Sequence, residues 1–191
     1  MKKHLLFLLL SIMGWLMVSC GVRTAADSCR VRVAVGFPEY TRACLYDTDG
    51  RWLDSLQWQE REIVFVRTDT AGMPYVAFVT LLNPVDSIDR VQMPVVIEGG
   101  DVQVEIGEYI TTSGTPLNRC LQDFLNALQA TRDAVKQADI SYEDYRKSFS
   151  EFYRQQILVN KDNVVGGFIF QQYGIHLNQE DASLVKAQLG N

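Results

Sequence analysis

Histidine is nearly absent from this sequence, and so are the patterns that identify many enzymes. The 191 residues contain two histidines, His4 and His176, and four cysteines that form no Cys-x-x-Cys motif. Because His176 is the one histidine after residue 4, a metal site with two histidine ligands is excluded for the chain that follows the N-terminal segment. His176 lies in "YGIHLN" without an accompanying nucleophile, so we expect a loop histidine with no catalytic role. We name no catalytic residue, no metal site and no cofactor, and favour a protein that is not an enzyme.

Positive charge is also scarce. The chain has 18 lysines and arginines against 23 acidic residues, which gives a formal charge of −5. Removal of residues 1–19 takes Lys2 and Lys3 away and lowers this charge to −7. Nucleic acids and anionic lipid surfaces are bound by clusters of basic residues. The composition therefore argues against a nucleic-acid partner.

Only one long apolar run is present, from Leu5 to Val18. At about 14 residues it is too short for a transmembrane helix, which needs roughly 20. A basic start, Met1 to His4, precedes the run, and a small residue, Ser19, follows it. This order is typical of a secretory signal peptide, which we place at residues 1–19. The alternative is a short membrane anchor that is retained.

A cysteine directly follows this segment. The tetrad Met17-Val18-Ser19-Cys20 resembles the bacterial lipobox, in which a diacylglycerol is joined to the cysteine thiol and the peptide is cut before it. Stable anchoring needs at least two acyl chains, and such a lipid supplies them. We expect a lipoprotein held to the bacterial cell envelope through Cys20, on the periplasmic side of the outer membrane, with residues 20–28 as a tether. The alternative is an unmodified cysteine that lies near the cleavage site by chance.

The part from residue 29 to residue 110 alternates between apolar and polar residues. Arg30 to Phe37 predicts a half-buried strand, and Asp47-Thr48-Asp49-Gly50 predicts a turn rather than a calcium loop. Further strands are predicted at residues 42–46, 52–58, 62–66, 74–82, 90–98 and 102–106. About seven short strands at this spacing favour an antiparallel β-sandwich or an open, barrel-like sheet.

Helical periodicity replaces this pattern in residues 111–191. Thr115-Pro116 predicts the start of a helix with threonine as its N-cap, and Ser141 with Asp144 resembles a capping box. Residues 164–173 predict a buried helix despite its two glycines, and Asn178 caps a last one. We expect three to four helices packed on the strands or following them. Strands followed by helices predict an α+β fold.

Three stretches are similar to a family of bacterial domains. They are residues 45–66, the segment "MPVVIEGGDVQVEI" at 93–106, and "TSGTPLN" at 112–118. The chain thereby resembles, over residues 29–135, a domain of unknown function that commonly precedes a thioredoxin-like domain in Bacteroidetes lipoproteins of the thiol–disulfide interchange type. The resemblance implies a β-rich domain packed against helices on a membrane-anchored protein. Redox-active members carry Trp-Cys-x-x-Cys, so we expect the thioredoxin-like part to be absent here.

Three cysteines remain besides Cys20. Cys29 and Cys44 lie on neighbouring predicted strands, and outside the cytoplasm they can form a disulfide if both face one side at the required separation. The alternative is that each is a small buried apolar residue. Cys120 lies on the apolar stripe of the first predicted helix, so we expect it in the core.

Two tryptophans suggest a further role. Trp52 and Trp58 are six residues apart, an even spacing that puts both on one face of a regular strand, where they can pack in a core or stack on sugars. The leading hypothesis is an anchored envelope lipoprotein that binds a protein partner or supports a complex. The alternatives are a redox-accessory protein that works with a separate thioredoxin-like oxidoreductase, and a glycan-binding lipoprotein.

Overall fold

The first of two β-sheets brings the beginning of the domain next to a segment far along the chain. The computed structural model of the protein describes residues 28–57, 62–68, 72, 74–86 and 88–189. The strand order is β4-β1-β7-β8, with bounds Glu62–Arg67 (β4), Cys29–Val35 (β1), Gly100–Ile106 (β7) and Ile110–Ser113 (β8). β1 is antiparallel to β4 and parallel to β7, and β7 is antiparallel to β8.

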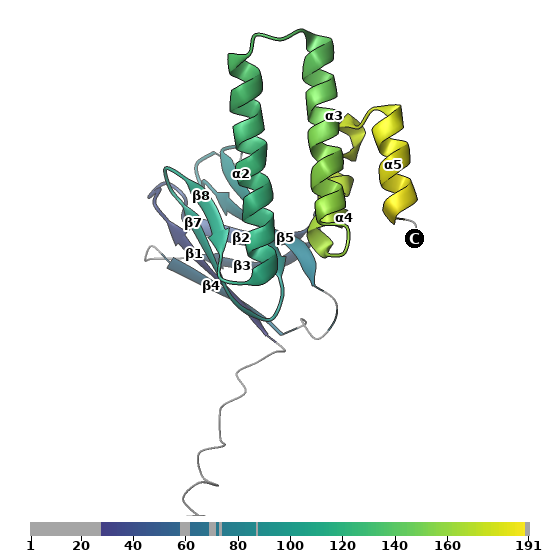
Figure 1. Cartoon of the computed structure of the whole chain (residues 1–191). Helices are drawn as coiled ribbons and strands as arrows, with labels where there is room; N and C mark the ends of the chain where they lie inside the picture. Colours follow the sequence, from purple (N-terminus) through teal and green to yellow (C-terminus); the bar gives the residue numbers. More distant parts are fainter. Residues whose placement is uncertain (1–27, 58–61, 69–71, 73, 87, 190–191) are drawn as a thin grey trace, which may run out of the picture.

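The second sheet is antiparallel throughout and lies against the first (Figure 1). Its order is β3-β2-β5-β6, with bounds Trp52–Gln57 (β3), Arg42–Asp47 (β2), Tyr75–Leu82 (β5) and Arg90–Ile97 (β6). The space between the sheets is filled by alternate residues of both, including Val31, Phe65, Leu45 and Val79. This alternation follows from the two-residue period of a strand.

Four α-helices follow the strands within the described residues: α2 (Pro116–Gln137), α3 (Tyr142–Val159), α4 (Val164–Tyr173) and α5 (Gln179–Leu189). A short 3₁₀ helix, η1 (Gly174–His176), precedes α5. In Figure 1, α2 and α3 run in opposite directions and are joined at their far ends. α4 packs against β5 and α3, and α5 packs against α3. None of the helices in the described part of the chain has the length and apolar character needed to cross a membrane.

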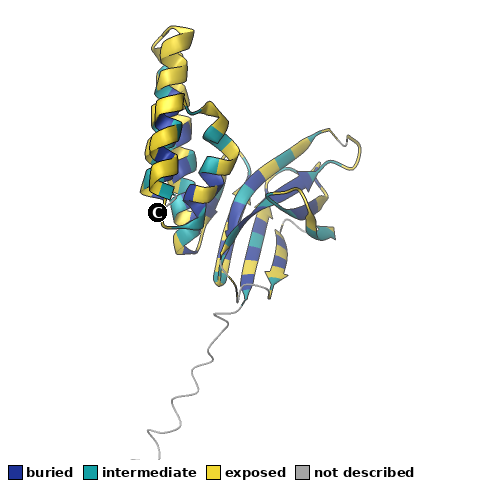
Figure 2. Cartoon of the chain, turned by 90° about the vertical axis from the view of Figure 1, so that its right-hand side faces the viewer, coloured by how far each residue is buried: buried dark blue, intermediate teal, exposed yellow. Residues whose placement is uncertain are grey.

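A second core lies between the helices and the outer face of the second sheet. Val76 and Val96 contribute from the sheet, and the helices contribute mainly Leu121, Ile157 and Ile169. β5 and β6 are therefore buried on both faces at this end, in agreement with the nearly continuous apolar run of residues 74–82. Figure 2 shows the exposed residues of the helices on the sides that turn away from the sheets.

The α+β fold class is confirmed, and the predicted helices are found. Ser141 Oγ accepts a hydrogen bond from the backbone N–H of Asp144 at 3.1 Å, as a capping residue should. Two details differ from the expectation. An eighth strand, β8, extends the β part to Ser113 in place of the predicted end at residue 110, and Thr115 makes no side-chain capping bond to α2.

The side chain of Asn118 closes the edge of the sandwich where α2 begins. Asn118 is fully buried, and its oxygen accepts from the backbone N–H of Val96 (2.9 Å) and from the Thr112 hydroxyl (3.0 Å). Its nitrogen donates to the Val96 carbonyl and to Thr115 Oγ1, both at 2.8 Å. These four bonds use the full hydrogen-bonding capacity of an amide. Because Val96 is in β6 and Thr112 in β8, Asn118 joins one edge strand of each sheet to α2.

The residues around Asn118 explain why the segment at 112–118 has its particular composition. Thr115 Oγ1 is bonded to Asn118, and the backbone N–H of Leu117 is instead capped by the Glu98 carboxylate at 2.8 Å. Gly114 has φ +102°, and a Cβ there would lie 2.1 Å from the carbonyl oxygen of Asp101. Only glycine fits both conditions. The residues of this segment therefore have structural roles at the junction between the sheets and α2.

Gly166 has a comparable role in α4. A Cβ at this position would lie 2.3 Å from the carbonyl oxygen of Asn160, at the end of α3. Glycine costs a helix interior about 1 kcal/mol relative to alanine. Here the missing side chain lets α4 approach the end of α3 closely, which accounts for one of the two glycines in this helix.

We predict that Asn118→Ala destabilises the protein by about 2–4 kcal/mol, because it leaves the buried N–H and C=O of Val96 without partners. Urea unfolding followed by circular dichroism measures the change. Asn126→Ala, an exposed position on the same helix, is the matched control, for which we expect less than about 0.5 kcal/mol. Equal effects of the two substitutions would contradict the role of Asn118.

Candidate functional site

The helices cover only one end of the outer face of the second sheet. Ala43 and Leu45 of β2 point into the core between the sheets, so Cys44 between them points outward. Strand pairing aligns Cys44 with Thr80 of β5, and Thr80 with Gln92 of β6. The apolar residues Val76 and Val96 at the other end of the face lie beneath the helices. The row from Cys44 to Gln92 lies next to this covered end, and within it Cys44 and Thr80 are buried whereas Gln92 is exposed.

A groove runs along this uncovered end. One cavity of about 400 Å³ lies over the strands, and one of about 800 Å³ lies beside α2 and α4. The two share Phe78, Gln92 and Gln172 in their linings, so they adjoin each other along one groove. We call it the outer-face groove and define it by Tyr46, Phe78, Thr80, Arg90, Gln92 and Gln172. Two of these residues are aromatic, three are neutral and polar, and one is a cation.

Positive charge gathers at the strand end of the groove, where Arg90 is part of the lining and Arg42 lies beside it, outside the lining. Arg42, Leu82 and Arg90 form one row across β2, β5 and β6, and both arginines are exposed. Neither arginine forms an ion pair with another described residue, and Arg42 donates only a long bond of 3.4 Å to Ser55 Oγ. Burial and the neighbouring Cys44 raise the pKa of Tyr46, whereas the charges of Arg42 and Arg90 act to lower it. The Tyr46 hydroxyl therefore interacts electrostatically with both arginines.

The turn next to the groove uses its carboxylates internally. Asp47 Oδ1 accepts from the backbone N–H groups of Asp49 (3.0 Å) and Arg51 (2.8 Å). Its second oxygen forms an ion pair with Arg51 Nε at 2.9 Å. No cluster of three or more potential metal ligands occurs among the described residues. The acidic residues of this segment thus act in the turn, as the sequence predicted.

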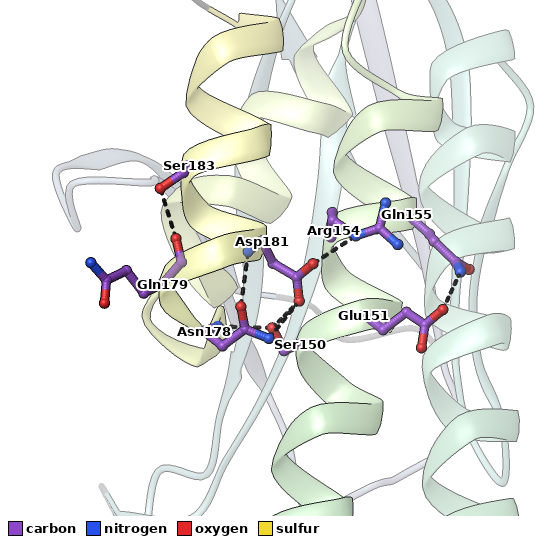
Figure 3. A network of polar contacts seen from close by, with 8 residues as sticks. All are labelled: Ser150, Glu151, Arg154, Gln155, Asn178, Gln179, Asp181 and Ser183. Carbon is purple, nitrogen blue, oxygen red and sulfur yellow. Dashed lines mark hydrogen bonds and ion pairs between the residues drawn. The ribbon is translucent and has the colours of Figure 1, made fainter.

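A second polar cluster joins α5 to α3 (Figure 3). Ser150 Oγ donates to the Asp181 carboxylate and accepts from the backbone N–H of Asn178. Asp181 also forms an ion pair with Arg154 at 2.8 Å, and its backbone N–H is capped by Asn178. A serine beside an aspartate suggests a nucleophile, but this hydroxyl is 1% exposed and already both donates and accepts. The cluster is therefore structural.

His176 lies away from the groove, in η1. Its exposed ring stacks on Tyr153, with ring centroids 5.7 Å apart. Burial raises the pKa of Tyr153. No serine or cysteine of the described residues is bonded to His176, and the histidine belongs to an aromatic cluster along α3. The sequence placed it in a loop before a helix, and the structure gives that loop a single 3₁₀ turn.

The two cysteines of the predicted disulfide, Cys29 and Cys44, lie on opposite sides of the second sheet. Cys29 of β1 is buried in the core between the sheets, whereas Cys44 lies on the opposite face of the second sheet. The structure therefore does not bring the predicted disulfide pair together, because the second sheet lies between the two thiols. Cys120 is half-buried on α2 beside the second core, which is less than the full burial that we expected. Cys20 lies outside the described residues.

The tryptophan pair also needs a correction. Trp52 is 61% exposed and pairs with Tyr46, so the two rings occupy neighbouring positions on the outer face. A register irregularity between Leu45 and Tyr46 moves Leu56 to the core face, although it has the same parity as Trp52. Even spacing therefore does not place residues of this strand on one face. Trp58 lies outside the described residues.

The segment before Arg90 is held by Asp89. Its carboxylate accepts from the Asn83 amide and from the Tyr40 hydroxyl, both at 2.8 Å. These two bonds lower the pKa of Asp89 below its ordinary value of 3.8, and the bond from Asn83 has the larger effect. The start of β6, and with it Arg90, is thereby tied to the segment that precedes β2.

Comparison with models of known protein families and with curated protein sequences finds no match for this chain.

We predict that Asp89→Asn lowers the urea midpoint at pH 7, and that the difference from the unchanged protein shrinks as the pH falls below about 4. The reason is that a carboxylate with a lowered pKa stabilises the fold fully above its unfolded value and loses this effect as it is protonated. Unfolding at pH 7 and pH 3 measures both differences. Asp123→Asn on the exposed side of α2 is the control. A gap that is constant over this pH range would contradict the role of Asp89.

Proposed function

We propose that the chain is a lipid-anchored lipoprotein of the bacterial cell envelope whose domain binds a ligand or partner without catalysis. The observation that supports binding most directly is the outer-face groove. It offers polar and aromatic side chains over an open depression, as binding sites do. No nucleophile with a neighbouring general base lines it among the described residues. Recognition, rather than bond cleavage, is the chemistry that these side chains support.

The anchor is proposed from the sequence alone. Met17-Val18-Ser19-Cys20 follows the apolar run, and β1 starts at Cys29. Eight residues therefore lie between the lipid-bearing cysteine and the first strand. At the maximum length of a peptide chain they span about 30 Å. The tether thus keeps the domain near the membrane surface, where an envelope partner is also expected.

The redox alternative is less well supported than the binding role. A reactive thiol must be accessible and have its thiolate stabilised. Cys29 and Cys44 are 0% and 2% exposed, so a partner's thiol cannot reach either. Cys120 is half-buried against apolar side chains of the helical core. The glycan-binding alternative is favoured by a specific observation, the exposed ring of Trp52 beside Tyr46.

We predict that Cys20→Ala abolishes membrane attachment, because the acyl chains have no thiol to join. In native cells the unchanged protein is expected in the membrane fraction, and its mass should start at residue 20 and include the lipid. Cys120→Ala is the matched control and should remain in the membrane fraction. A Cys20→Ala protein that stays membrane-bound, or an unchanged protein that keeps residues 1–19, would contradict the proposed anchor.

We predict that filling the groove with Gln92→Trp removes binding. Purified protein immobilised on beads is exposed to detergent-solubilised envelopes, and the retained proteins and glycans are identified by mass spectrometry. Gln155→Trp, at an exposed position on α3, is the control and should retain the same components as the unchanged protein. If Gln92→Trp retains them as well, the groove is not the binding site.

A further inference from the structure

The chemistry of the groove narrows the class of ligand, provided that the proposed binding function holds. Arg42 and Arg90 lie in one row, two strands apart, which corresponds to about 10 Å between their Cα atoms. Both side chains are exposed, and neither is neutralised by a carboxylate of the described residues. Two unpaired arginines in a chain of net negative charge form a local site for an anion, and a planar carboxylate matches their geometry.

Aromatic rings lie next to these cations. Strand pairing aligns Trp52 with Tyr46, Tyr46 with Phe78 and Phe78 with Pro94 in a single row. This row is four residues along β2 from the arginine row, about 14 Å. Phe78 and Tyr46 line the groove, and Trp52 extends the row at the exposed edge. The faces of such rings bind the apolar faces of sugar rings.

Neutral hydrogen-bonding groups occupy the space between the two rows. Gln92 Nε2 donates a long bond of 3.4 Å to Thr80 Oγ1, and the side chain of Gln172 forms no bond with another described residue. Further amides line the adjoining cavity along α2, but they already bond within the protein: Gln122 accepts from the backbone N–H of Thr112 and donates to Asn126, and Gln129 donates to Asp133. Gln92 and Gln172 are therefore the amides available to a ligand. Groups that both donate and accept are suited to hydroxyls, which do the same.

A peptide fits this groove less well than a sugar. Extended peptides add to the edge of a sheet through backbone hydrogen bonds. The groove lies on the face of the sheet, and the edge of β6 at Val96 is already occupied by Asn118. Three acidic residues line the two cavities. Asp47 of the smaller cavity is paired with Arg51, and Glu108 and Asp133 line only the larger cavity, so an anionic group is favoured only at the arginine end.

We propose that the outer-face groove binds an acidic oligosaccharide. Its carboxylate lies between Arg42 and Arg90, its hydroxyls bond to Gln92 and Gln172, and one sugar ring lies on Tyr46 and Phe78. The site requires no metal and no covalent step.

Isothermal titration calorimetry with the purified protein tests this assignment. The probes are trigalacturonic acid, a chondroitin hexasaccharide, the carboxyl-reduced neutral form of the first, and hexaglutamate. We expect at least one acidic sugar to bind about tenfold or more tightly than the neutral sugar and hexaglutamate, with an affinity that falls as salt is raised. Arg90→Gln should weaken this binding at least about tenfold, whereas Arg119→Gln, an exposed arginine on α2, should leave it unchanged.

Several outcomes would overturn the proposal. They are no binding of either acidic sugar, equal binding of the neutral sugar or of hexaglutamate, and an Arg90→Gln variant that binds as well as the unchanged protein. Urea unfolding of each variant confirms that it is folded. If these sugars fail while envelope components are still lost on Gln92→Trp, the ligand class is wrong and the proposed binding function stands.

Discussion

The buried amide of Asn118 is the interaction on which the arrangement of the domain depends. It completes the hydrogen bonds of an edge strand in one sheet, contacts an edge strand of the other, and lies in the first turn of α2. An apolar residue at this position leaves polar groups of the edge unsatisfied in a dry interior. Asn118 thereby attaches the start of α2 to the edge of the sandwich.

The position of the helices determines which part of the sheet stays open. α2 starts at the sandwich edge, and α4 lies over β5, so the Val76–Val96 end of the face is covered. The rows of Thr80 and Arg90 lie next to that covered end and carry polar side chains. The outward-facing residues of β5 and β6 alternate with core residues along each strand. They are apolar where the helices cover them, and several are polar where the helical layer ends. The groove is thus a consequence of where the helical layer ends.

Much of the fold was predictable, because it rests on local patterns. The alternation of apolar and polar residues predicted seven strands. Ser141 and Asn178 predicted the starts of two helices, because both are residue types that cap a helix N-terminus. β8 was missed because four residues give too short a pattern, and Asn118 because a polar residue in a helix normally faces water. The groove residues come from β2, β5, β6 and α4, so only strand pairing brings them together. In the sequence, the groove was indicated locally only by two polar residues, Thr80 and Gln92, at outward positions of otherwise apolar strands.

The parallel pairing of β1 with β7 determines when the first sheet can be completed during synthesis. β1 begins at Cys29 and its partner ends at Ile106, with five other strands in between. Strands that are so distant in the sequence pair slowly, since a long loop must close before the contacts between β1 and β7 form. The centre of the first sheet is incomplete until more than half of the chain has been synthesised.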